Sequence, residues 1–139
     1  MRTDIVFFQQ YAVPYFGVLS MAAHLNCKGY KTDVFIESID KLDTLKGLNP
    51  RLIGISVMSP EHNWLVRVIK TIKKETPSAT IIVGGIHAML YPNEILSETE
   101  ADLVCNSEGE EVLLNVLVEL DRSKPDWSKI TGIAYRDKD

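Results

Sequence analysis

Short apolar runs alternate along this chain with longer segments in which apolar residues recur at helical spacing. The apolar runs lie at residues 5–8, 33–36, 51–57, 80–83 and 101–105. Because most of their positions are apolar in succession, they are typical of strands buried on both faces of a sheet. Helical patterns cover about residues 15–28, 61–75 and 110–120. A short helix or turn is expected at 42–48 and a short helix at 92–97.

This alternation predicts an α/β fold. Buried strands that alternate with helices form a parallel sheet with right-handed connections and helices on both faces. We expect a flavodoxin-like three-layer sandwich with a five-stranded parallel sheet, its strands in the order 2-1-3-4-5. In this order a ligand lies over the carboxyl ends of the central strands. The site is therefore expected in the loops that begin at Gln9, Ser56, Gly84 and Asn106.

The chain is long enough for one domain. Its 139 residues, of which 45% are hydrophobic, suit a single contiguous core. We assign residues 1–121 to this domain. Residues 122–139 contain Pro125, a strand-like piece at 130–135 and a charged end, and they are expected to be a linker towards a further C-terminal domain.

Charge and composition exclude several classes of partner. The formal net charge is −4 and acidic and basic residues are interspersed, so nucleic acid is not an expected partner. No apolar run reaches the roughly 18 residues that cross a bilayer, so we expect a cytoplasmic protein without a membrane partner. Cys27 and Cys105 lie in separate elements and cannot build a disulfide framework or hold an iron–sulfur cluster by themselves.

The loop after the first apolar run and the end of the third strand exclude two common classes of protein with this fold. A dinucleotide-binding domain has a glycine-rich turn there, whereas residues 9–14 contain no glycine. A receiver domain has acidic residues in that loop and an aspartate at the end of the third strand, where this chain has Gln9 and Ser56. Neither class fits these positions.

Small and apolar residues fill the loops of the expected site at 56–59, 84–88 and 106–110. Gly84 and Gly85 lack a Cβ atom. They either let a bulky cofactor approach the backbone or are turn glycines that a positive φ requires. The Ser56 hydroxyl either binds a ligand atom or is satisfied by its own turn. Both alternatives stay open for these three residues.

Four motifs carry a family resemblance. They are Leu-Ile-Gly-Ile-Ser-Val-Met-Ser at 52–59, Val-Gly-Gly-Ile-His-Ala at 83–88 with Pro92-Asn93-Glu94, Ser-Glu-Gly-Glu at 107–110, and Gly-Ile-Ala-Tyr-Arg-Asp at 132–137. In this order they resemble the cobalamin-binding domain of cobalamin-dependent radical S-adenosylmethionine enzymes. The resemblance implies that the dimethylbenzimidazole tail of cobalamin is inserted beside the third and fourth strands, with the corrin over the strand ends.

The resemblance and the loop positions together assign the cofactor contacts. The expected cofactor-binding residues are Tyr15, Gly17, Ser56, Val57, Met58, Ser59, Gly84, Gly85, His87, Ala88, Glu108 and Gly109. No catalytic or metal-ligating residue is expected in this chain.

The first loop departs from related cobalamin domains. Those of methionine synthase and the mutases carry an Asp-x-His-x-x-Gly motif whose histidine binds cobalt. Counting back from Gly17, this chain has Ala12 in the aspartate place and Pro14 in the histidine place. The resemblance therefore implies base-off cobalamin without a histidine as the lower ligand. His24 and His62 are expected to be packing or surface residues.

The implied function is that of a cofactor domain and not of a complete enzyme. The iron–sulfur cluster and S-adenosylmethionine would belong to a downstream C-terminal radical domain of a methyltransferase or cyclase. Two other classes stay open. One is a stand-alone cobalamin carrier or sensor, and the other is a flavodoxin-like interaction module without a cofactor.

Overall fold

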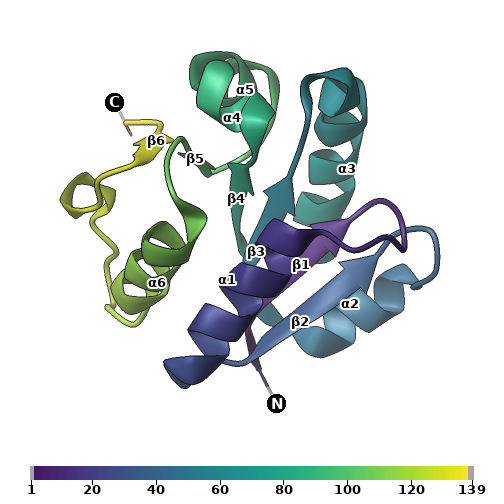
Figure 1. The fold of residues 1–139 in the computed structure, drawn as a ribbon, viewed down its shortest axis with the longest axis horizontal. Coiled ribbons are helices and arrows are strands. Elements are labelled where there is room, and N and C mark those ends of the chain that lie inside the picture. The colour runs from purple at the N-terminus through teal and green to yellow at the C-terminus, as the bar shows by residue number, and fades with distance from the viewer. Residues whose placement is uncertain (1, 138–139) are drawn as a thin grey trace.

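The computed structural model describes residues 2–137 and contains one sheet of six strands (Figure 1). The strands are β1 (Thr3–Gln9), β2 (Thr32–Ile36), β3 (Pro50–Ser56), β4 (Thr80–Gly84), β5 (Leu103–Cys105) and β6 (Ile133–Tyr135). Their order in the sheet is β2-β1-β3-β4-β5-β6. The first five strands are parallel, which confirms the expected flavodoxin-like sandwich, and β6 is antiparallel to β5.

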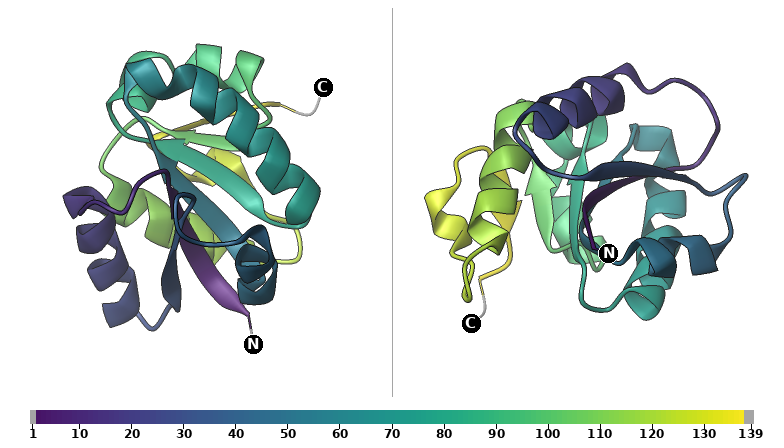
Figure 2. Two further views of the ribbon diagram at one scale, coloured as in Figure 1. Left: turned by 90° about the vertical axis from the view of Figure 1, so that its right-hand side faces the viewer. Right: turned by 90° about the horizontal axis from the view of Figure 1, so that it is seen from below.

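Helices connect the parallel strands and cover both faces of the sheet (Figure 2). They are α1 (Phe16–Cys27), α2 (Leu42–Leu48), α3 (His62–Glu75), α4 (Ile86–Leu90), α5 (Pro92–Glu98) and α6 (Gly109–Leu120). Short 3-10 turns lie at Ser59–Glu61 and Trp127–Lys129. Within residues 2–137, none of these helices is long and apolar enough to cross a membrane.

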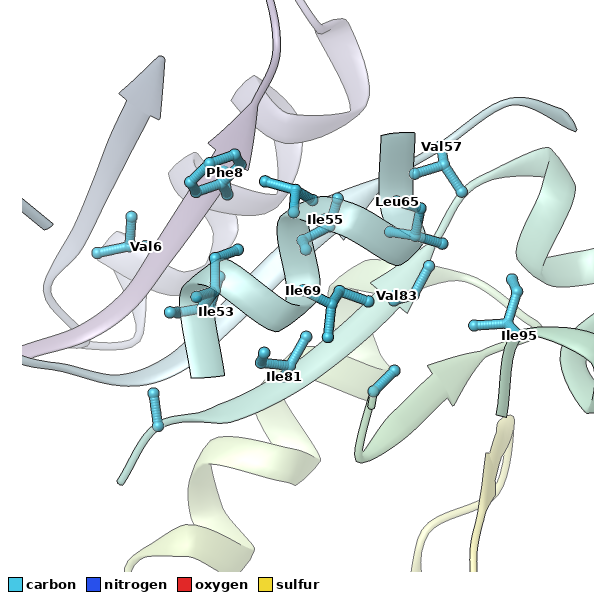
Figure 3. Close-up of a cluster of buried hydrophobic side chains, with 14 of the residues drawn as sticks. Val6, Phe8, Ile53, Ile55, Val57, Leu65, Ile69, Ile81, Val83 and Ile95 are labelled. Atoms are coloured by element: carbon cyan, nitrogen blue, oxygen red, sulfur yellow. The ribbon is translucent and has the colours of Figure 1, made fainter. Parts of the chain in front are cut away.

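Side chains of β1 alternate between two apolar layers, which explains why its sequence is apolar throughout. Ile5 and Phe7 pack in the layer that contains α1 and α6. Val6 and Phe8 pack in the opposite layer, together with Leu65 of α3. Figure 3 shows this second layer, with side chains of β1, β3 and β4 directed towards α3.

The sixth strand corrects the expectation of five strands and lies in the segment that was expected to be a linker. Cys105 of β5 pairs with Ile133, and Leu103 pairs with Tyr135. This pairing satisfies backbone groups that an edge strand would leave open. Arg136 Nη2 donates hydrogen bonds to the carbonyl oxygens of Leu96 and Thr99, both at 2.7 Å. The strand-like piece at 130–135 therefore packs onto the domain, at least over residues 133–135.

Candidate functional site

A cavity of about 480 Å³ opens at the carboxyl edge of the sheet, on the face that α1 and α6 cover. These two helices are neighbours (Figure 1). We call this cavity the slot. It is lined by Phe7, Gly17, Val18, Met21, Gly54, Ile55, Ser56, Ile82, Gly84, Gly85, Ile86, Met89, Cys105, Ser107, Glu108, Gly109, Glu110 and Leu113. Five of these residues are buried aliphatic or aromatic wall residues, namely Phe7, Val18, Ile55, Ile82 and Leu113.

Glycines in two neighbouring strands open the floor of the slot. Gly54 lies in the middle of β3, and Gly84 ends β4. A Cβ atom at Gly54 would lie 3.3 Å from Phe7 Cδ1, whereas the nearest atom to a Cβ at Gly84 would be Cys105 Cβ at 3.8 Å. Because a side chain at either position would point into this space, the missing side chains keep the slot open.

Ser56 supplies a polar group beside this floor. It is the register partner of Gly84 and lines the slot. Among the hydrogen bonds of residues 2–137 none involves its hydroxyl, whereas the backbone N–H of Val57 donates to the carbonyl of Gly84 at 3.0 Å. The Ser56 hydroxyl is therefore available to a ligand, as both donor and acceptor.

Gly85 has a backbone reason to be glycine. Its φ is +93°, and a Cβ atom there would lie 2.7 Å from the carbonyl oxygen of Val57 and 2.9 Å from its nitrogen. The turn geometry therefore requires glycine at this position. Of the two interpretations left open by the sequence, cofactor approach suits Gly84 and the turn requirement applies to Gly85.

The wall opposite β4 comes from the starts of α1 and α6. No atom lies within 4 Å of the position that a Cβ would take at Gly17, and Gly109 lies against the flexible Met21 side chain. Ser20 Oγ donates a hydrogen bond of 2.9 Å to Glu110 Oε1, which joins the two helices at this end. The wall is therefore held together by a polar contact but leaves room beside Gly17.

The structure brings half of the expected site residues together in the slot and places the others elsewhere. The slot contains Gly17, Ser56, Gly84, Gly85, Glu108 and Gly109. The expected residues outside it are Tyr15, Val57, Met58, Ser59, His87 and Ala88. Val57 and Ala88 are buried in the layer around α3, and Met58 and Ser59 are exposed beyond the end of β3. Tyr15 precedes α1, and burial raises the pKa of its phenol.

A hydrogen-bond chain occupies the other side of the same edge. Ser59 Oγ lies 3.0 Å from His87 Nδ1, and His87 Nε2 lies 2.8 Å from His62 Nδ1. His62 Nε2 lies 2.6 Å from Glu98 Oε2. His62 is therefore part of a polar chain and not only a surface residue. Burial, followed by the neighbouring His62, lowers the pKa of His87.

Several lining residues were not expected from the sequence. Gly54 carried a usable signal, because a glycine inside an apolar strand marks a place where another group approaches the backbone. Helix α4 was not predicted, and its Ile86 and Met89 line the slot. Cys105 also lines it, and burial raises the pKa of this thiol. The slot is therefore mostly apolar, with a neutral thiol at its side and the polar residues Ser107, Glu108 and Glu110 in its lining.

No group of three or more histidine, cysteine, aspartate or glutamate residues is arranged to hold a metal ion in the part of the chain that the structure describes. The slot lies beside the loops that follow the strands, as the doubly wound topology predicts.

Comparison with known proteins identifies the domain. The B12 binding domain family matches residues 8–117. The anaerobic magnesium-protoporphyrin IX monomethyl ester cyclase of Rubrivivax gelatinosus is 27% identical over 131 residues, covering 85% of this chain and 23% of that protein. The cytidylyl-2-hydroxyethylphosphonate methyltransferase of Streptomyces wedmorensis is 31% identical over 101 residues, covering 72% of this chain and 19% of that protein. The chain thus spans less than a quarter of the length of either relative.

A solved structure shows the same fold. It is that of the radical S-adenosylmethionine methyltransferase TsrM from Kitasatospora setae with cobalamin and a 4Fe-4S cluster bound. The TM-score is 0.83 at 17% identity, over 99% of this chain and 30% of that chain. With the family match over most of its length and this agreement in fold, the chain belongs to the B12 binding domain family and is a cobalamin-binding domain.

Proposed function

We propose that this domain binds cobalamin base-off, with the benzimidazole end of the cofactor in the slot and no histidine of this chain below cobalt. We further propose that it is the cofactor domain of a longer radical S-adenosylmethionine enzyme. The observation that carries the first proposal is the slot itself, an apolar cavity of about 480 Å³ at the carboxyl edge, where β3 and β4 lack side chains.

The slot fits a flat aromatic base. Five buried wall residues are aliphatic or aromatic, and the floor at Gly54 and Gly84 is bare backbone. The Ser56 hydroxyl can donate a hydrogen bond to a ring nitrogen or accept one from a neighbouring ligand group. Burial raises the pKa of the Cys105 thiol, so the thiol itself adds no charge to the slot. An aromatic ring bearing methyl groups matches this combination of surfaces.

The histidines support a lower face without a protein ligand. None of the three histidines, all of which lie within residues 2–137, lines the slot. Both ring nitrogens of His87 are engaged, one with Ser59 and the other with His62. His24 lies in α1, where its Nε2 is 3.7 Å from Glu111. Pro14, at the place of the cobalt-binding histidine in related domains, offers no donor atom to a metal.

Exposed apolar side chains surround the carboxyl edge, both at the slot and beyond it. They include Tyr11 and Val13 before α1, Met58 after β3, and Ile86 and Met89 of α4, which also line the slot. A large macrocycle with an apolar face would cover such a surface and exclude water from it. When bound, cobalamin supplies methyl-group transfer or one-electron chemistry at cobalt. The residues of this chain would hold its tail in the slot and orient it through Ser56.

The relatives support the proposal of a longer enzyme. Both curated relatives are several times longer than this chain and are named as a cyclase and a methyltransferase. A downstream domain holding the iron–sulfur cluster and S-adenosylmethionine would then be the partner of this one. Reaction and substrate would be determined by that partner.

Binding of hydroxocobalamin tests the function. The purified domain is mixed with the cofactor, separated by gel filtration and measured by visible absorption spectroscopy. We expect stoichiometric retention with the spectrum of the base-off form. A base-on spectrum of the retained cofactor would refute the slot assignment. Loss of all cobalamin on the column would instead favour an interaction module without a cofactor.

A release experiment separates a cofactor domain from a carrier. The loaded domain is diluted into an excess of a different cobalamin, and exchange is followed by absorption. A cofactor domain retains its ligand over hours, whereas a carrier exchanges it within minutes. The control is free cobalamin mixed with serum albumin, which should show no retention.

A further inference from the structure

The Ser59–His87–His62–Glu98 chain joins four elements at the carboxyl edge and has no part in the slot. Ser59 lies in the turn after β3, His62 begins α3, His87 lies in α4 and Glu98 ends α5. The three hydrogen bonds measure 3.0, 2.8 and 2.6 Å. His87 is buried, whereas Ser59 and Glu98 at the two ends are exposed. The chain therefore connects two surface positions through a buried imidazole.

The direction of each hydrogen bond follows from the carboxylate at one end. An ionised Glu98 can only accept, so His62 donates to it from Nε2. The neutral His62 then has a lone pair at Nδ1, which accepts from His87 Nε2–H. His87 Nδ1 in turn accepts from the Ser59 hydroxyl. In this state Ser59 uses its only hydrogen internally and presents lone pairs outward.

One added proton reverses the direction of the chain. When His62 carries a hydrogen on both nitrogens, its Nδ1–H donates to His87 Nε2. His87 must then carry its hydrogen on Nδ1 and donate it to Ser59. The Ser59 hydroxyl keeps its hydrogen but no longer donates it to His87, so the O–H points outward. All three hydrogen bonds survive, but Ser59 changes from an acceptor to a donor for any group outside.

The surroundings of the chain favour the added proton on the imidazole next to Glu98 and not on His87. Burial and the proximity of His62 lower the pKa of His87, while Glu94 and Glu98 act in the opposite direction. The ring of Tyr91 lies against His87, with centroids 5.4 Å apart. Glu61 binds the backbone N–H of Met58, and Arg136 binds carbonyl oxygens of α5, so neither joins the chain.

We propose that Glu98, His62 and His87 are positioning residues that make the Ser59 hydroxyl a hydrogen-bond acceptor at neutral pH, for a primary amide N–H of the corrin rim. This inference rests on the proposed cobalamin function. Ser59 follows the slot residue Ser56 by three positions and is exposed beside the apolar edge. A proton added to the chain turns Ser59 into a donor, and the amide N–H then loses its acceptor.

Affinity as a function of pH tests the ligand contact. Binding of cyanocobalamin, whose cyanide ligand avoids titration of a bound water, is measured between pH 8 and pH 5. For the wild-type domain we expect about a five-fold weaker affinity at the acidic end, as for loss of one hydrogen bond. Ser59→Ala is expected to be about five-fold weaker at pH 8 and to show no further change. Ser59→Thr, which keeps the hydroxyl, restores the pH dependence.

The matched control is Ser78→Ala, an exposed serine before β4 at the opposite edge of the sheet, which should behave as the wild type. Equal affinities of Ser59→Ala and wild type at pH 8, or an unchanged pH dependence in Ser59→Ala, overturn the inference. A wild-type domain that binds no cobalamin at any pH overturns the proposed function together with it. Binding that ignores Ser59 overturns this inference alone.

Nitrogen NMR of the ligand-free domain tests the chain directly. At pH 8 both His62 and His87 are expected as Nε2–H tautomers. On acidification His87 is expected to change to the Nδ1–H tautomer while it stays neutral. In Glu98→Gln this change requires a lower pH, because the carboxylate no longer stabilises the added proton. A His87 that keeps its Nε2–H tautomer while His62 is protonated overturns the relay.

Discussion

Ser56 and Gly84 are register partners across β3 and β4, and together they present one hydroxyl and one bare backbone position to the slot. The nearest atom to a side chain added at Gly84 would be 3.8 Å away. The fold therefore has room for a larger residue at Gly84, but the added side chain would fill space that the ligand needs. A substitution at Gly84 can therefore impair cofactor binding without impairing folding.

Gly84→Val is expected to weaken cobalamin binding and leave the domain folded. The valine would occupy the slot, and overpacking of about 1–3 kcal/mol corresponds to roughly 5- to 150-fold in Kd. Retention on gel filtration and thermal unfolding measure the two effects. Gly47→Val is the control, because Gly47 lies in α2 with no atom near an added Cβ. Unchanged retention by Gly84→Val would show that the ligand does not enter the slot.

Gly85→Ala is expected to destabilise the domain whether or not cobalamin is present. The positive φ and the close backbone atoms of Val57 strain any side chain, at a cost of about 1–3 kcal/mol. Urea unfolding of the ligand-free protein measures this loss. Gly84→Ala, one residue away and without a positive φ, should be within about 1 kcal/mol of wild type. A Gly85→Ala protein as stable as Gly84→Ala would contradict the turn requirement.

Much of the fold followed from the sequence because its signals are local. Continuous apolar runs marked the parallel strands, and the doubly wound order placed the ends of β3 and β4 at one edge. The loops containing Ser56, Gly84 and Gly109 therefore met as expected. Strand β6 could not be predicted with the same ease, because its three residues depend on pairing with the edge of β5.

Two physical causes place expected site residues outside the slot. Side chains alternate along a strand, so the one that follows Ser56 turns to the opposite layer, where Val57 is buried. The partnership of His62 and His87 depends on how α3 and α4 pack, and no local pattern records that. Only Gly54 could have been recognised in advance, as a glycine inside an apolar strand.

The cob(II) form of the bound cofactor should show no nitrogen coupling from an axial protein ligand. Pro14 stands at the expected histidine place, and both nitrogens of His87 are already hydrogen-bonded. Electron paramagnetic resonance of the reduced complex measures this coupling. A triplet splitting from axial nitrogen would contradict the proposal. Repeating the spectrum with His87→Gln would then show whether His87 is the source.

The domain alone should not cleave S-adenosylmethionine, even when loaded with cobalamin. Reductive cleavage uses an iron–sulfur cluster held by cysteine thiolates, and this chain has only Cys27 and Cys105. Cys27 is exposed near the end of α1, whereas Cys105 is buried in β5. The loaded domain is incubated anaerobically with S-adenosylmethionine and a reductant. Formation of 5′-deoxyadenosine above the level with free cobalamin would refute the assignment to a cofactor domain.

His87 should make the stability of the domain depend on pH. Burial, and then His62, lower its pKa in the folded state from the ordinary value of 6.5. The unfolded chain therefore takes up a proton below about pH 6.5 that the folded domain still excludes. The free energy of unfolding falls as the pH decreases from 6.5 towards the lowered pKa, with a slope of at most about 1.4 kcal/mol per pH unit for one proton.

Urea unfolding between pH 8 and pH 5 measures this slope. His87→Gln is expected to be less stable at pH 8 by about 1 kcal/mol, because it loses hydrogen bonds, but its stability should fall less on acidification. Ser59→Ala is the matched control, because it removes one hydrogen bond of His87 and retains the titrating imidazole. Its stability should therefore keep the acid slope. If His87→Gln and wild type lost stability equally between pH 6.5 and pH 5, another group would cause the slope, and the buried imidazole would not exclude a proton.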